Sequence, residues 1–143
     1  MQFEDYKHHI ALQIRFCDID KLNHLNNSVY HNFFELGRVT YFNQLFKNTI
    51  NWNERGFYLA RTEINHLLSI YLNDEIFCFT KVIKLGNKSI TVKNSICKLQ
   101  NNKLIECANG IGILVAMDFT KNQSTIVPTP WRTAMEGFEN NTN

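Results

Sequence analysis

Residues 29–46 place the strongest constraint on the fold, because apolar side chains surround nearly the whole of a segment with helical spacing. The few polar side chains that interrupt this pattern include His31, Glu35 and Arg38, which share one narrow strip, and the last two are spaced to pair. A helix that is apolar on almost every side must be enclosed. The apolar positions recur at intervals of three and four: Val29, Tyr30, Phe33, Phe34, Leu36, Val39, Phe42, Leu45 and Phe46.

Alternating apolar residues and short turns predict strands on both sides of this helix. A period-two run over 10–16 precedes it, and four strand-like runs follow it, at 57–69, 75–85, 89–99 and 104–117. Turns this short join antiparallel strands, since a parallel crossover needs a dozen or more residues. We therefore expect an α+β fold in which a curved antiparallel sheet wraps around one long central helix. It should form a single domain over 1–143, with a core at about 10–128 and a frayed tail at 140–143.

Composition and charge narrow the function classes. A chain with 44% hydrophobic and 20% charged residues is typical of a soluble globular protein. The net charge of +2 has no clustered basic face, which argues against a nucleic-acid partner. We find no signal peptide and no apolar run long enough for a membrane span, so we expect a cytoplasmic protein. Its four cysteines lack the CxxC spacing of a zinc site and are expected to be reduced, mostly buried thiols: Cys17, Cys78, Cys97 and Cys107.

A cluster of polar residues separates the first strand from the long helix. It contains two carboxylates, Asp18 and Asp20, the imidazole of His24, and the amides of Asn26 and Asn27. The free N–H groups and the positive dipole end of a helix N-terminus favour negative charge. An acid held beside them stays ionised and can act as a base or nucleophile near those donors. The cluster therefore predicts a reaction site at the start of the helix.

These residues resemble a known family. The cluster and the helix after it are similar to the hotdog-fold acyl-CoA thioesterases of the 4-hydroxybenzoyl-CoA thioesterase type. The matching residues are Asp18, Asp20, His24, Asn26, Asn27 and Tyr30, followed by Glu35 and Arg38 on the helix. A second landmark of that family is matched by residues 60–64 followed by 73–76. The resemblance spans roughly residues 10 to 128 and implies a hotdog fold.

The resemblance also implies roles for individual residues. Asp20 matches the catalytic carboxylate, which attacks the thioester carbonyl or activates a water. Asn27 stands where a backbone N–H at the start of the helix polarises that carbonyl, and His24 stands where a histidine orients the loop or shuttles a proton. Glu35 is a reserve candidate, since some relatives carry a catalytic Glu on the helix. Asn23 replaces a usual Gly, and Asn tolerates left-handed backbone angles better than other non-glycine residues.

The implied function is hydrolysis of an acyl-CoA thioester to the free acid and CoA, by a homodimer or homotetramer with sites at subunit interfaces. No cofactor or metal is expected, because coenzyme A is part of the substrate. Two alternatives stay open: a thioesterase acting on acyl-carrier-protein thioesters, and a non-catalytic protein that binds acyl thioesters. Enoyl-CoA hydration is disfavoured, because neither aspartate has the required spacing from His24 and no proline lies between them.

Overall fold

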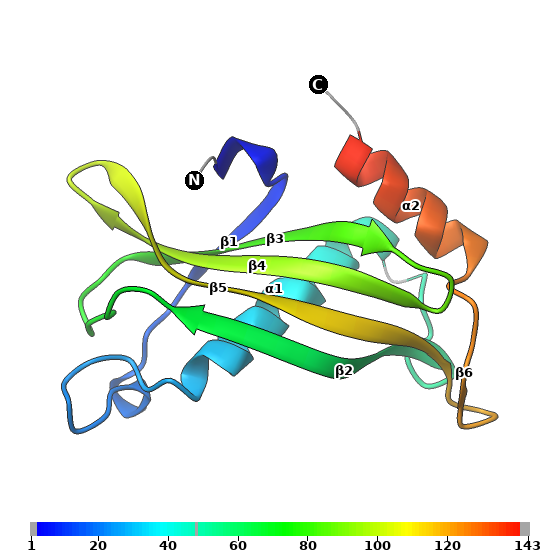
Figure 1. Cartoon of the computed structure of the whole chain (residues 1–143), viewed down its shortest axis with the longest axis horizontal. Coiled ribbons are helices and arrows are strands. Elements are labelled where there is room, and N and C mark those ends of the chain that lie inside the picture. Colours follow the sequence, from blue (N-terminus) through cyan, green and yellow to red (C-terminus); the bar gives the residue numbers. More distant parts are fainter. Residues whose placement is uncertain (1–2, 48, 141–143) are drawn as a thin grey trace.

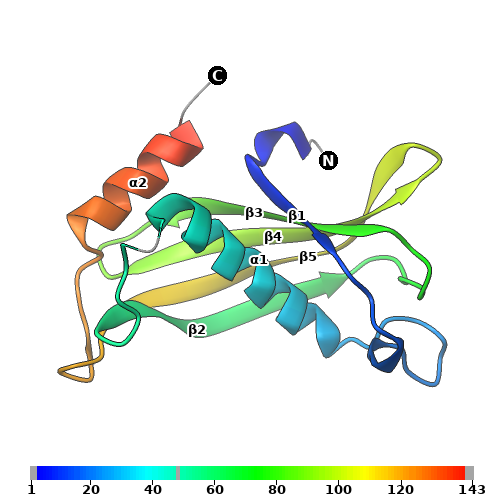
Figure 2. The same cartoon turned by 180° about the vertical axis from the view of Figure 1, so that it is seen from behind.

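One long helix lies across the concave face of a curved antiparallel sheet (Figures 1 and 2). This computed structural model describes residues 3–47 and 49–140. Within them, the strands form one six-stranded sheet in the order β1-β3-β4-β5-β2, with β6 paired to β5. This arrangement confirms the predicted hotdog fold. The elements are η1 (Phe3–Asp5), β1 (His8–Leu12), η2 (Phe16–Asp18), α1 (Val29–Phe46), β2 (Arg55–His66), β3 (Ile76–Leu85), β4 (Ser89–Gln100), β5 (Lys103–Asp118), β6 (Gln123–Ser124) and α2 (Thr129–Asn140).

The core is built around α1, which packs most closely on β1, β3 and β4. The close approach depends on Gly37, because a Cβ there would lie 2.7 Å from Thr80 Oγ1 and 2.8 Å from Cys78 Sγ. Apolar clusters enclose both halves of the helix, one around Phe34 and one around Tyr41. The helix therefore lies nearer to the β3 side of the sheet than to its β2 edge.

The first strand is shorter than the alternation predicted. It ends at Leu12, and Phe16 lies in η2 with 85% of its side chain exposed. The cause is a local turn: Asp18 accepts the backbone N–H of Arg15 at 2.8 Å and binds its guanidinium at 2.9 Å. These bonds close a 3-10 turn that extended backbone could not form. The expected pairing of Glu35 with Arg38 is also absent from the described residues, since Arg38 is buried while Glu35 is exposed.

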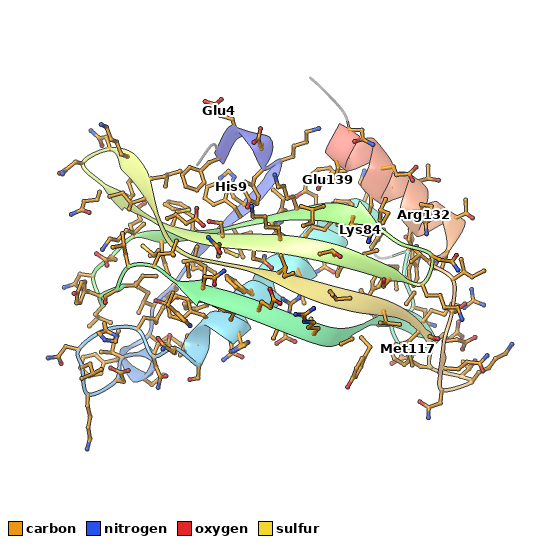
Figure 3. All side chains as sticks on the ribbon, viewed as in Figure 1. Glu4, His9, Lys84, Met117, Arg132 and Glu139 are labelled. Atoms are coloured by element: carbon orange, nitrogen blue, oxygen red, sulfur yellow. The ribbon has the colours of Figure 1, made fainter. Side chains whose placement is uncertain are left out.

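The C-terminal helix α2 was not predicted. Pro130 stands in its first turn, where a missing N–H costs nothing, and Trp131 and Met135 pack into the core. Near the end of α2 lies Glu139, which is labelled in Figure 3. Its carboxylate accepts the Tyr41 hydroxyl at 2.7 Å and the Val82 N–H at 3.3 Å. Because β1 pairs with β3 only as far as Thr80, this carboxylate covers part of the edge of β3 that β1 leaves open. Of the tail expected to fray, Asn140 belongs to α2 and residues 141–143 lie outside the described part.

The cysteines largely follow the expectation. Cys78, Cys97 and Cys107 are buried free thiols, whereas Cys17 is exposed. Burial raises the pKa of Cys78 and of Cys97 to about 12, so both stay protonated and unreactive at neutral pH. No helix in the described part of the chain combines the length and the apolar character that a bilayer span requires.

Candidate active site

The polar cluster forms a compact loop at the amino end of α1. A bridge between Ile19 and Leu25 closes this loop, and the N–H of Asp20 donates to the carbonyl of His24 at 3.1 Å. Within it, the Asn23 N–H donates to the Asp20 carbonyl at 3.0 Å, and Asn23 has a φ of 65°. This value lies in the left-handed region, which Asn tolerates better than other non-glycine residues, as expected at this position.

The two aspartates have different environments. Asp18 is 2% exposed, and its carboxylate is occupied by the Arg15 guanidinium and N–H, which hold its pKa below the ordinary value. Asp20 is half-buried, and within the described residues only the Leu22 N–H donates to its carboxylate, at 2.9 Å from Oδ1. Asp18 therefore supports the turn, while Asp20 keeps a carboxylate oxygen available for chemistry.

The start of α1 carries a backbone donor that no described residue uses. The Asn26 side chain accepts the N–H and the hydroxyl of Ser28, both at 3.1 Å, and its carbonyl accepts the Val29 N–H at 2.9 Å. Asn26 thus holds the turn that leads into α1, whose N-cap residue is Ser28. The N–H of Asn27 meets no acceptor among the described residues, so it is free for a ligand oxygen.

His24 and Asn27 share one small cavity of about 120 Å³, whose other walls come from α1 and from the end of β2 and the segment after it: Tyr30, His66, Leu67, Leu68 and Ser69. In Figure 1, the blue loop before α1 and the end of β2 lie at the same end of the molecule. The structure thus brings two of the three expected site residues into one hollow. Asp20 does not line this hollow, but its backbone N–H donates to the carbonyl of His24, which does.

His66 is a member of this hollow that the sequence did not reveal. Its ring stands edge-on to Tyr30, with centroids 4.6 Å apart and planes at 88°. Burial, and to a lesser extent the nearby His31, lower the pKa of His66, which favours the neutral imidazole at physiological pH. The sequence gives it no distinct signal, because the same strand carries other titratable residues, among them Arg61 and Glu63.

Comparison with known proteins gives one matching family and several similar solved structures. The family described as the thioesterase-like superfamily matches residues 14–135. A thioesterase from Thermus thermophilus, solved with coenzyme A and Zn, is 27% identical, with a TM-score of 0.83 and coverage of 96% of this chain and 97% of that one. No curated protein sequence matches the chain.

Two further solved structures share the fold. A predicted thioesterase from Bacillus stearothermophilus is 22% identical, with a TM-score of 0.80 and coverage of 91% of this chain and 94% of that one. A mutant 4-hydroxybenzoyl-CoA thioesterase, complexed with 4-hydroxybenzoyl-CoA, is 13% identical, with a TM-score of 0.81 and coverage of 90% and 97%.

Proposed function

Since the chain belongs to the thioesterase-like superfamily, we propose that it hydrolyses an acyl-CoA thioester to the free acid and CoA. The observation that carries this proposal is the unused N–H of Asn27, which lies at the amino end of α1 on the same hollow as His24. A donor in this place suits the charge that develops on a thioester oxygen during attack.

In the proposed reaction, the thioester oxygen accepts the Asn27 N–H, and the dipole of α1 adds to the stabilisation. One such donor typically contributes about 3 kcal/mol to the transition state. Asp20 either takes a proton from a water that attacks the carbonyl carbon, or attacks that carbon itself to form a mixed anhydride that water then cleaves to the free acid. Both routes require the carbonyl to lie at the mouth of the hollow nearest the loop. His24 orients that loop. The thiolate of CoA leaves readily, and no cofactor is needed.

The choice of CoA as carrier is supported by the relatives that were solved with coenzyme A or with an aryl-CoA. An acyl-carrier-protein thioester would present the same carbonyl to the same residues, so it is the first alternative. A protein that binds acyl thioesters without turning them over is the second.

We also propose a homodimer or homotetramer with sites at the subunit interfaces. The outer edge of β2 is unpaired within the described residues, and Tyr58 on this strand is an exposed apolar side chain (62% exposed). Two such edges can pair antiparallel about a twofold axis. That pairing would set the start of β2 in one subunit opposite the end of β2 in the other.

The experiment that tests the proposal measures hydrolysis of a panel of acyl-CoAs with short, long and aromatic acyl groups. The readout is the decrease in the absorbance of the thioester bond. This readout avoids thiol reagents, which would also label the exposed Cys17. We expect saturable hydrolysis of at least one acyl-CoA. Hydrolysis of acyl-carrier-protein thioesters alone would favour the first alternative, and saturable binding with no turnover of either would favour the second.

A further inference from the structure

A second and larger cavity lies between the middle of α1 and the start of β2. Its volume is about 450 Å³, within the usual range for small-molecule sites of roughly 300–1,000 Å³. It exists because Gly37 holds α1 close to β3, and because Gly112 on β5 leaves room beneath Leu59 and Arg38. The lining residues are Glu35, Arg38, Val39, Phe42, Asn43, Trp52, Phe57, Leu59 and Leu114.

Arg38 is the unusual member of this lining, because its charge is buried and no carboxylate within the described residues forms an ion pair with it. Its exposed fraction is 7%, and within the described residues its guanidinium forms no hydrogen bond and no ion pair. Burial lowers the pKa of Arg38, while Glu35 and Cys78 oppose that shift, and a guanidinium keeps its proton in proteins. An unpaired buried charge is costly unless a partner of opposite charge joins it.

Most of the remaining wall is apolar. The rings of Phe42, Trp52 and Phe57 come from three separate segments, and aliphatic side chains complete the surface. Such a wall favours a ligand with an aromatic or aliphatic body over a small hydrated ion. The planar fork of a guanidinium matches a carboxylate through two parallel hydrogen bonds.

We propose that this cavity binds a small carboxylate with an aromatic or aliphatic body, and that Arg38 pairs with its carboxylate group. The carboxylate has two natural sources: a free acid, such as the product of the proposed hydrolysis, or the far end of an acyl group that itself carries an acid. Binding to the cavity does not depend on the hydrolysis. Glu35 stands exposed at the rim, where its negative charge weakens the attraction for an anion.

Calorimetric titration of the full-length protein tests the binding, with hexanoate and phenylacetate as probes and their neutral amides as matched ligands. We expect the acids to bind about tenfold or more tightly than the amides, since a hydrogen bond to a charged group contributes on this scale. Trp52 fluorescence should respond to the acids. Absence of saturable binding, or equal binding of acids and amides, would overturn the proposal.

Variants separate the role of Arg38 from general effects. Arg38→Met should lose about tenfold or more in affinity for the acids while retaining the unfolding temperature, because a buried unpaired charge is removed. Glu35→Gln should bind the acids more tightly. Arg132→Met, which changes the same charge on α2 away from the cavity, should bind as the wild type does. Unaltered affinity in a folded Arg38→Met protein would also overturn the proposal.

Turnover then identifies the source of the carboxylate. Adipoyl-CoA carries a carboxylate at the far end of its acyl group, and hexanoyl-CoA does not. If Arg38→Met loses more kcat/KM for adipoyl-CoA than for hexanoyl-CoA, the cavity binds the end of the acyl group. If the two losses are equal, the cavity binds a free acid. If no thioester is hydrolysed, the proposed function fails, while the calorimetric result still decides the binding.

Discussion

Asp18 and Asp20 are only two residues apart, but their carboxylates have different hydrogen-bond partners. Asp18 is buried against Arg15 and shapes the turn, whereas Asp20 faces fewer donors and lies in the loop tied to His24. The sequence could suggest the second as the reactive acid only through a family resemblance, because spacing alone does not reveal which carboxylate is already paired. The left-handed turn at Asn23 was predictable, because Asn tolerates that conformation.

The pairing of Asp18 predicts a pH dependence of stability. Its folded pKa lies below the unfolded value of about 3.9, so its contribution is complete above roughly pH 4 and is lost as the pH falls through the folded pKa. The wild-type unfolding temperature should therefore drop more steeply than that of Asp18→Asn between about pH 4 and pH 2. Asp5→Asn, at an exposed site, should follow the wild type. Parallel curves for wild type and Asp18→Asn would rule this out.

At the scale of elements, the position of α1 depends on the contact at Gly37. A side chain there would collide with Thr80 and Cys78, both fully buried, so Gly37→Ala should cost about 1–3 kcal/mol in the free energy of unfolding. Gly137 on α2 is a matched control, since a Cβ there meets nothing within 4 Å. Gly137→Ala should be stabilising by about 0.5–1 kcal/mol. Denaturant unfolding measures both, and equal effects would contradict the packing described.

Strands β2 to β5 were predicted to within a few residues, because alternation and turn residues mark them locally, whereas the two-residue strand β6 was not predicted. Helix α2 was not, since Pro128 and Pro130 look like the end of a strand and its packing partners lie far away in the chain. His66 and the burial of Arg38 were missed for the same reason: long-range packing decides them, and local sequence patterns do not report it.

At the scale of the whole molecule, the unpaired edge of β2 predicts self-association. Tyr58→Lys should shift the protein toward monomer in sedimentation experiments, because it would place a charge on the edge strand through which two copies would pair. Ile83→Lys, on β3 and away from β2, should leave the mass unchanged. A monomeric wild type, or a Tyr58→Lys protein with the wild-type mass, would refute pairing through this edge.

The most direct test of the account is the turnover number of Asp20→Asn against its best acyl-CoA, with Asp5→Asn as the control for the same change at an exposed site. We predict a fall of about 10²- to 10⁴-fold in kcat with an unaltered unfolding temperature, because the amide fills the same volume but cannot act as a base or nucleophile. Wild-type turnover in a correctly folded Asp20→Asn protein would contradict the account.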